Sequence, residues 1–251
     1  MNIQKRPLLC IITVVFNANS TIEATIKSVL SQDTDLFEYW IIDGGSTDGT
    51  LDIIRRYDQY LTGWVSEPDK GIYDAMNKGI DRSTAEWLFF LGADDLLCEG
   101  ILTKIKHFFS PVLKVVYGNV KFDNGHIMRS HIGLRCLFEN RLHHQSAFYH
   151  RSLFNDFRYN QRFRICADYE LTLRIYLQKQ PALYIPYEIA FFASGGASDE
   201  LTSEDINNIR GMYIKYPLMN TIISLMINTY YFYFKTKLKV KKHLQKALAS
   251  A

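Results

Sequence analysis

The chain of 251 residues lacks most of the features that mark a specialised class of protein. Its four cysteines are scattered at positions 10, 98, 136 and 166, with no Cys-x-x-Cys spacing. This scatter argues against a zinc site or a disulfide framework and favours a reducing compartment. The formal net charge is only +3. A charge this small gives no sign of a nucleic-acid partner, and we expect none.

Two phosphate-binding signatures are also missing. The first apolar run is not followed by Gly-x-Gly-x-x-Gly, and no Gly-Lys-Ser/Thr of the Walker type occurs. Their absence counts against a dinucleotide-dependent dehydrogenase and a P-loop enzyme. The apolar run that begins at Leu8 lacks a convincing small-residue cleavage site, so it is better explained as a first strand than as a secretion signal. We expect a cytoplasmic protein.

Strand-like and helix-like patterns alternate over the first 110 residues. Hydrophobic residues make up 47% of the chain and charged residues 22%, which is enough apolar material for one large α/β domain, with or without an appendage. Strands are expected at 8–16, 39–42, 62–66 and 86–91, and helices between them, including 50–58 and 72–79. The alternation predicts an α/β fold with a Rossmann-like, mostly parallel sheet flanked by helices.

The second half has a different pattern. Two strand-like runs, 112–122 and 126–131, surround the turn 123–125 and predict a hairpin. Further on we expect a strand at 147–149, a helix at 168–179, a strand at 182–193 and a flexible loop at 194–198 suited to folding over a ligand. Residues 1–200 are therefore assigned to one domain, with a nucleotide-binding half at about 1–110 and an acceptor half at about 111–200.

The remaining residues, 201–251, are expected to form a C-terminal helical extension. Residues 217–234 are strongly apolar, but Asn220, Ser224 and Asn228 recur every four residues and form a polar stripe. Six lysines follow between positions 235 and 246. This combination favours an amphipathic helix lying on a membrane surface with anionic headgroups. A spanning helix, or a helix packed on the domain with a solvated tail, remains an alternative.

Acidic and amide side chains follow several of the predicted strands. The run 86–91 reads as a strand buried on both faces, and Asp94 and Asp95 come shortly after it. Charges there are costly unless paired, and a divalent cation is a good partner. Asn17 and Asp43 also lie at carboxyl ends of strands, which share one edge in a parallel sheet. The alternative for the acid pair is a cap on a helix beginning near Leu96.

Four segments in order, residues 12–17, 41–50, 66–79 and 91–95, resemble family 2 glycosyltransferases of the GT-A fold. The third segment, together with His144-Gln145 and Ser194-Gly195-Gly196, looks most like the bacterial enzymes that build colanic acid, capsule and O-antigen units. The resemblance covers roughly residues 8–200. It implies inverting transfer of a sugar from a nucleotide-diphosphate donor, with UDP favoured, to an acceptor hydroxyl, assisted by Mn²⁺ or Mg²⁺.

The resemblance also implies roles for individual residues. Asp95, the last acid of an Asp-x-Asp-like motif whose first acid is replaced by Ala93, would hold the metal with help from Asp94. Asp168 would be the general base, and Ala167 stands where many relatives carry Glu. The nucleotide-sugar would contact Thr13, Phe16, Asn17, Asp43, Gly44, Asp69, Lys70, Asn77 and Asp94.

Some of these residues have structural alternatives. Asp168 could simply cap the helix that follows it. Asp43 could be the turn residue of an Asp-Gly pair. His144 could contact phosphate or the acceptor, or add a metal ligand, and a buried, hydrogen-bonded histidine is an equally good interpretation.

The expected acceptor is a glycan carried on a polyprenyl diphosphate at the inner face of a bacterial membrane, where the enzyme would be peripheral. Nucleotidyl transfer is one rival function. It should show a Gly-rich loop with a basic residue after the first strand, which residues 16–19 lack. The other rival is a non-catalytic nucleotide-binding or scaffold protein of the assembly machinery. The acids Asp43, Asp95 and Asp168 disfavour it.

Overall fold

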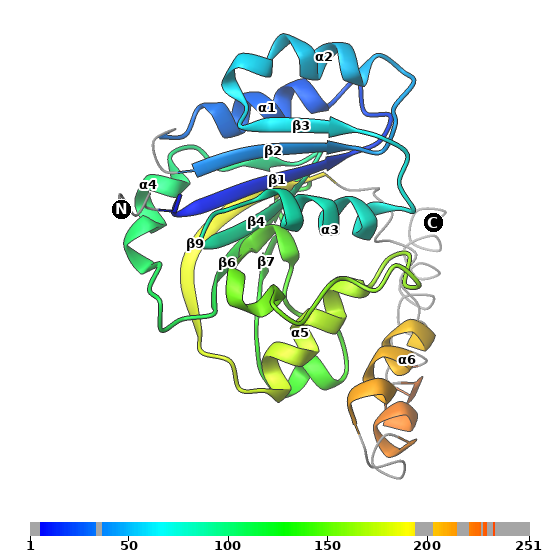
Figure 1. Ribbon diagram of the computed structural model, residues 1–251. Helices are drawn as coiled ribbons and strands as arrows, with labels where there is room; N and C mark the ends of the chain where they lie inside the picture. The colour runs from blue at the N-terminus through cyan, green and yellow to red at the C-terminus, as the bar shows by residue number, and fades with distance from the viewer. Residues whose placement is uncertain are drawn as a thin grey trace, which may run out of the picture.

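The computed structural model describes residues 6–33, 37–193, 203–214, 221–226, 228, 229 and 233, which form a curled sheet with helices on both faces (Figure 1). The strands are β1 (Leu9–Val15), β2 (Phe37–Asp43), β3 (Gly63–Ser66), β4 (Trp87–Gly92), β5 (Leu96–Leu97), β6 (Val115–Phe122), β7 (Ile127–Arg129), β8 (Ala147–His150) and β9 (Ala182–Phe192). The α-helices are α1 (Ile22–Leu30), α2 (Thr50–Arg56), α3 (Ile72–Arg82), α4 (Ile101–Ile105), α5 (Ala167–Leu177) and α6 (Ser203–Tyr213).

The sheet is mixed: the predicted parallel arrangement holds for its first half, whereas most pairings of the second half are antiparallel. Its strand order is β3-β2-β1-β4-β8-β6-β9-β5, and β7 pairs with β6 alone. Strands β1 to β4 are parallel to one another, β8 lies antiparallel between β4 and β6, and β5 lies antiparallel to β9. The predicted hairpin is β6–β7, whose turn includes Gly125 at a φ of +80°. Strand β9 returns parallel to β6.

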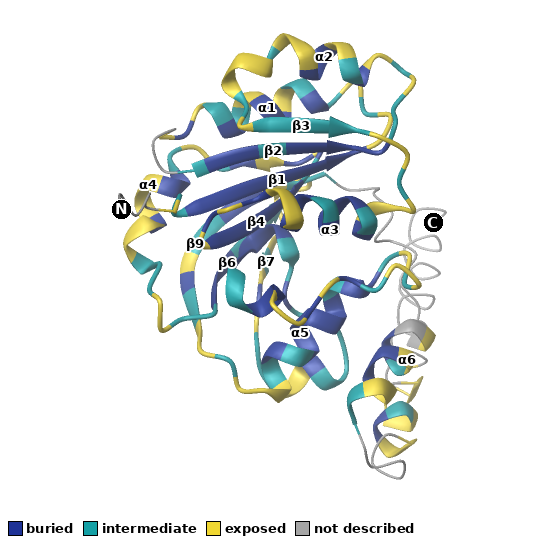
Figure 2. Ribbon diagram, viewed as in Figure 1, coloured by how far each residue is buried: buried dark blue, intermediate teal, exposed yellow. Residues whose placement is uncertain are grey.

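Two apolar cores lie on opposite faces of the sheet, and β1 contributes to both. Leu9 and Ile11 pack with α1, α2 and α4, whereas Cys10, Ile12 and Val14 pack with α3 and α5. Every residue of β1 is buried, which explains the unbroken apolar run in the sequence (Figure 2). Helix α3 and the start of α5 are thereby held on the same face of the sheet.

Helix α6 packs on α5 through a third apolar cluster, which includes Tyr169, Leu173, Ile206 and Ile209. Nearby, the buried Arg210 donates to Ser224, so the described part of the C-terminal segment is attached to α6. No helix within the described ranges is both long and apolar enough to cross a membrane. The predicted loop 194–198, the domain boundary at residue 200 and the C-terminal lysines lie outside the described residues.

The carboxyl ends of β1, β2 and β4 meet at one edge of the sheet. Val15 pairs with Asp43, and Val14 with Gly92, so the residues that follow these three strands share a rim as expected. The helix expected near Leu96 is a wrong prediction. Leu96 and Leu97 form the edge strand β5 against β9, and α4 begins only at Ile101. Neither acid of the pair therefore caps a helix.

Candidate active site

A cleft with two connected lobes opens at this rim. The β1 lobe has a volume of about 830 Å³ and is lined by the end of β1 and the residues before α3, including Phe16, Asn17, Asp69 and Lys70. The α5 lobe, about 320 Å³, is lined by residues including Asp95, Asn140, His144 and Asp168. Six residues line both lobes and form their junction: Val14, Ile72, Tyr73, Gly92, Asp94 and Arg164.

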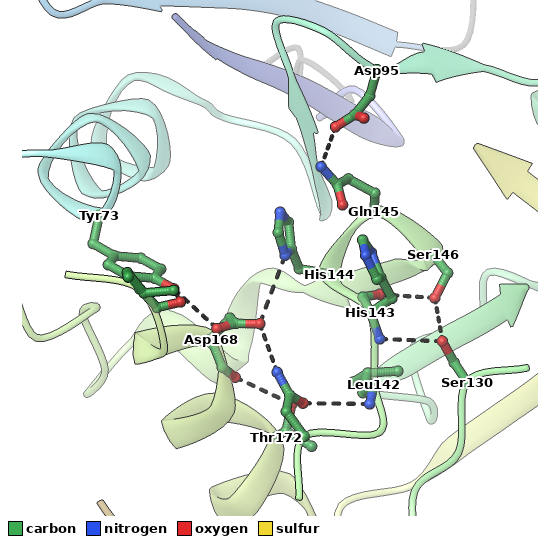
Figure 3. Close-up of polar contacts among 12 residues, drawn as sticks. Tyr73, Asp95, Ser130, Leu142, His143, His144, Gln145, Ser146, Asp168 and Thr172 are labelled. Atoms are coloured by element: carbon green, nitrogen blue, oxygen red, sulfur yellow. Dashed lines mark hydrogen bonds and ion pairs between the residues drawn. The ribbon is translucent and has the colours of Figure 1, made fainter. Parts of the chain in front are cut away.

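Asp168 projects into the α5 lobe from the first turn of α5. The helix begins at Ala167 with Cys166 as its N-cap, so the interpretation of Asp168 as a helix cap is wrong. Its Oδ2 accepts a hydrogen bond from the Asn140 amide at 2.7 Å, and its Oδ1 lies 3.0 Å from the Tyr73 hydroxyl (Figure 3). The His144 Nδ1 is 3.7 Å from Oδ2.

These neighbours keep Asp168 ionised. Burial alone would raise the pKa of the carboxyl, but hydrogen bonding and the charge of His144, together with the Tyr73 hydroxyl, hold the pKa below its ordinary value. Each carboxylate oxygen has two lone pairs. Asp168 can therefore accept a further proton or hydrogen bond at neutral pH while its two orienting contacts remain in place.

Tyr73 links two walls of the cleft. Its hydroxyl lies within hydrogen-bond distance of both Asp168 and the Ile165 carbonyl oxygen, the latter at 2.7 Å, so one proton is shared between two acceptors. The Tyr73 side chain is buried. Asn140 was missed altogether, because no motif surrounds it.

The two acids after β4 have different environments. Asp94 is exposed in the cleft, whereas the Asp95 side chain is 1% exposed. The Asp95 carboxylate accepts hydrogen bonds from the Ala193 backbone N–H at 3.0 Å and from the Gln145 side-chain amide. Burial, with the neighbouring charge of Asp94, raises the pKa of Asp95 to about 7. A cation beside these acids would reverse that shift.

Gly92 leaves a space bordered by two carboxylates and the Gln145 amide. A Cβ atom at this position would lie 2.4 Å from Asp95 Oδ2, 3.0 Å from Asp94 Oδ1 and 3.3 Å from Gln145 Nε2, so both carboxylates turn towards one point. The Oε1 atom of the adjacent Gln145 is buried and has no hydrogen-bond partner among the described residues. Carboxylate and amide oxygens are ligands that hard divalent cations prefer.

Asp94, Asp95 and Gln145 would supply only part of the ligands that a metal ion needs. No group of three or more His, Cys, Asp or Glu side chains within the described ranges could hold a metal ion. Mg²⁺ commonly binds to one or two carboxylates and completes its coordination with water and substrate phosphates. The space in front of Gly92 suits a cation bound in this way.

His144 lies between Asp168 and the Gln145–Asp95 pair (Figure 3). Its ring stacks on that of His143, with centroids 5.5 Å apart. Burial, and to a smaller extent His144, lowers the pKa of His143 to about 3, so His143 is neutral and packs against Phe192. Of the two histidines, His144 is therefore the one that contacts the catalytic candidates.

The β1 lobe has a rigid rim. Asn17, at a φ of +49°, donates its backbone N–H to the Ser46 hydroxyl and accepts the Thr47 N–H on its side chain at 2.9 Å. These bonds fix the segment after β1 to the segment after β2. Phe16 beside it is 61% exposed at the mouth of the lobe. An exposed aromatic ring in a rigid position is suited to contact with a flat ligand group.

Three of the residues predicted to bind nucleotide-sugar have side chains engaged elsewhere, and they are not among the residues that line the lobes. Thr13 is fully buried, with its hydroxyl 3.2 Å from that of Tyr39. The Asp43 carboxylate accepts from Gly45, Ser46 and Ser66, which supports the turn interpretation of Asp43. Asn77 bonds both the N–H and the C=O of Tyr159.

Gly44 affects the shape of the cleft because it has no side chain. A Cβ atom there would lie 2.4 Å from Asp69 Oδ2, so glycine leaves room for Asp69 to reach the β1 lobe. Asp69 also accepts the Gly71 N–H at 2.9 Å, which fixes the turn before α3. Lys70 lies beside it in the same lobe.

Comparison with known proteins agrees with this geometry. The family model described as glycosyl transferase family 2 matches residues 10–179. The chain is 35% identical over 218 residues to a PGL/p-HBAD biosynthesis glycosyltransferase of Mycobacterium bovis, covering 79% of this chain and 82% of the relative. It is 38% identical over 93 residues to TuaG of Bacillus subtilis, a putative teichuronic acid biosynthesis glycosyltransferase, covering 36% of this chain and 37% of the relative.

Solved structures show the same fold. Residues 1–349 of S. aureus TarS in complex with UDP-GlcNAc superpose with a TM-score of 0.70 at 17% identity, covering 90% of this chain and 73% of TarS. The mannosyltransferase PcManGT of Pyrobaculum calidifontis, in complex with GDP-Man and Mn²⁺, gives 0.60 at 19% identity over 77% of this chain and 59% of the other. With the family model covering most of the sheet and both sets of acids, the chain belongs to glycosyltransferase family 2.

Proposed function

We propose that this protein transfers a sugar, with inversion at the anomeric carbon, from a nucleotide-diphosphate donor to an acceptor hydroxyl. One observation carries the proposal: an ionised carboxylate, Asp168, and an acid pair, Asp94 and Asp95, line the same cleft from different elements. Inversion needs a base on the side of the anomeric carbon opposite the departing diphosphate. Asp168 would be this base, and the separate pair Asp94 and Asp95 would lie on the side of the diphosphate.

The donor nucleotide is assigned to the β1 lobe. This lobe is the larger of the two, and it combines the exposed ring of Phe16 with the carboxylate of Asp69 and the amine of Lys70. An aromatic face suits a base, a carboxylate suits base or ribose donors, and an amine suits phosphate. UDP is the favoured nucleotide, and the binding of UDP-GlcNAc by a protein of the same fold supports this choice.

The α5 lobe is assigned to the acceptor. The acceptor hydroxyl would hydrogen-bond to Asp168, which takes its proton as the oxygen attacks the anomeric carbon. Asn140 and Tyr73 hold the carboxylate in one orientation throughout. The bond between the anomeric carbon and the phosphate oxygen breaks, and its electron pair leaves with the nucleoside diphosphate.

A divalent cation, Mn²⁺ or Mg²⁺, would be held by Asp94 and Asp95 at the space in front of Gly92. When bound, such an ion neutralises charge on a diphosphate leaving group as a Lewis acid. The Mn²⁺ in the PcManGT complex supports this assignment. The Gln145 amide donates to Oδ2 of Asp95 and the Ala193 N–H donates to Oδ1, and these two bonds orient the carboxylate.

We propose a lipid-linked oligosaccharide of bacterial surface polysaccharide synthesis as the acceptor, at the inner face of the membrane. The relative named for teichuronic acid biosynthesis supports a polysaccharide pathway. The described C-terminal residues include the exposed apolar side chains of Ile222, Leu225, Met226 and Tyr233. These would contact lipid, and the lysines that follow in the sequence would contact anionic headgroups. Sedimentation with anionic vesicles tests this contact: a protein that stays in the supernatant contradicts it.

The test of the reaction class is a calorimetric titration with UDP and then GDP, each with and without Mn²⁺. Binding of one nucleotide that strengthens with the metal is expected. If neither nucleotide binds, nor dTDP or CMP, the chain does not use a nucleotide donor, and a scaffold role becomes the better explanation. A nucleotidyltransferase would instead release pyrophosphate from a nucleoside triphosphate, which the same samples can be assayed for.

A further inference from the structure

One arginine at the cleft has no part in the function described so far. Arg164 is exposed and lines both lobes at their junction, together with Asp94. Among the residues that line the α5 lobe it is the only lysine or arginine, and it shares the β1 lobe with Lys70 alone. A permanent positive charge therefore lies where the two ligands of a transfer reaction would meet.

The loop that carries Arg164 is firmly attached to α3. Asn77 bonds both backbone groups of Tyr159 at 2.9 Å, and the Gln161 side chain donates to Asp74 at 2.7 Å. On the other side of Arg164, the Ile165 carbonyl accepts from the Tyr73 hydroxyl. Because both flanks are fixed by side chains of one helix, the backbone of Arg164 is held in position before a ligand arrives.

The other charges at the junction indicate which ligand the guanidinium of Arg164 would bind. Asp94, Asp95 and Asp168 make the lining of the α5 lobe acidic, so a positive partner at the junction favours the entry of an anionic ligand. A guanidinium presents several N–H donors in a fixed plane that fits the oxygens of a phosphate group. Phosphate lies between the base-binding and sugar-binding parts of a nucleotide-sugar, and Arg164 lies between the two lobes.

We propose that Arg164 binds the diphosphate of the donor and stays on it as the leaving group departs. The inference rests on the proposed function. When the bond to the anomeric carbon breaks, the electron pair moves to the phosphate oxygen, and the guanidinium donates hydrogen bonds to the charge that develops. The proton from the acceptor goes to Asp168, and Arg164 keeps its own.

The experiment compares the affinities of UDP and of uridine, measured by calorimetry in Mn²⁺, for the wild type and three variants. If GDP is the tighter nucleotide, GDP and guanosine are used. Arg164→Ala is expected to weaken binding of the diphosphate about 10–100-fold, as expected for lost hydrogen bonds to a charged group, and to change nucleoside binding less than about twofold. Arg164→Lys, which keeps the charge without the planar fork, should be intermediate.

Arg162→Ala is the matched control. Arg162 is exposed on the same loop but lines a separate shallow depression with Arg158 and Asp81, so its loss should leave both affinities unchanged. Equal diphosphate affinity for Arg164→Ala and the wild type would overturn the inference and leave the proposed function intact. Equal losses for diphosphate and nucleoside would also overturn it, because they indicate a general loss of the pocket. A wild type that binds no nucleoside diphosphate would overturn the proposed function first.

Discussion

Replacing Asp168 with asparagine is expected to lower the rate of sugar transfer about 10²–10⁴-fold, the usual contribution of a general base. Asparagine has nearly the same shape but cannot take a proton from the acceptor. Donor affinity should stay within about twofold of the wild type, because Asp168 lines only the α5 lobe. Transfer is measured as release of nucleoside diphosphate in the presence of the acceptor, and binding by calorimetry.

The fold should survive this substitution. The new amide would place an NH₂ group where one of the two carboxylate oxygens now accepts from Asn140 or Tyr73. Asn140 can restore a hydrogen bond by rotating its own amide, so only a modest fall in melting temperature is expected. Asp156→Asn is the control, because Asp156 is an exposed acid paired with Arg174 away from the cleft lining. Full activity of Asp168→Asn would rule out Asp168 as the base.

The pH dependence of sugar transfer is a second test of Asp168 as the base. Since the pKa of Asp168 lies below its ordinary value, the carboxylate stays charged as the pH falls through the weakly acidic range. Loss of activity through protonation of Asp168 is therefore expected only below about pH 4, the ordinary value for aspartic acid. A loss of activity that depends on Asp168 and begins well above that pH would contradict the assignment of Asp168 as the base.

Removal of divalent cations is expected to lower the rate of sugar transfer about as much as Asp168→Asn does. Chelation with EDTA should lower transfer by about 10²–10³-fold, given the several kcal/mol that a metal contributes to stabilising a charged leaving group. Added Mn²⁺ or Mg²⁺ should restore it. Asp95→Asn should reduce transfer to a comparable extent and should make nucleotide binding insensitive to the metal.

The Asp95→Asn variant tests the role of the metal without a loss of fold, because the neighbouring groups can rearrange their hydrogen bonds. Asparagine keeps an oxygen for the Ala193 N–H. Its new NH₂ group can donate to the Gln145 Oε1 atom once the Gln145 amide, whose Nε2 now faces Asp95, rotates, and among the described residues this oxygen has no other partner. It also removes a buried charge, so stability without metal should not fall. Glu99→Gln is the control, an exposed acid that lines neither lobe. Undiminished activity in EDTA would exclude a metal-assisted reaction.

The sequence predicted the fold well where local patterns were strong. Apolar runs such as that of β1 are buried on both faces, and the alternation with amphipathic helices identified the parallel half of the sheet. The strand β5 was missed because two residues, Leu96 and Leu97, are too few to show a period. Only their pairing with β9, almost one hundred residues later, makes them a strand.

The shared edge of the sheet was predicted from the sequence, whereas the directions of the side chains were not. Strand ends correctly placed Asn17 and Asp94 at one rim, but a motif does not show which way a side chain turns. Thr13, in the segment 12–17, and Asn77, in the segment 66–79, have their polar groups engaged inside the protein. Asn140 and Arg164 lie in irregular loops, and only tertiary structure brings them to Asp168 and Asp94.

The position of β9 also affects the order in which this chain can assemble during synthesis. This strand is inserted between β6 and β5, and the residue after it, Ala193, supplies a hydrogen bond to Asp95. A nascent chain that has left the ribosome only as far as α5 has the acids of the cleft, but β5 has no partner and β6 has one free edge. The last strand within the described ranges thus closes the sheet and completes the surroundings of an acid encoded almost one hundred residues earlier.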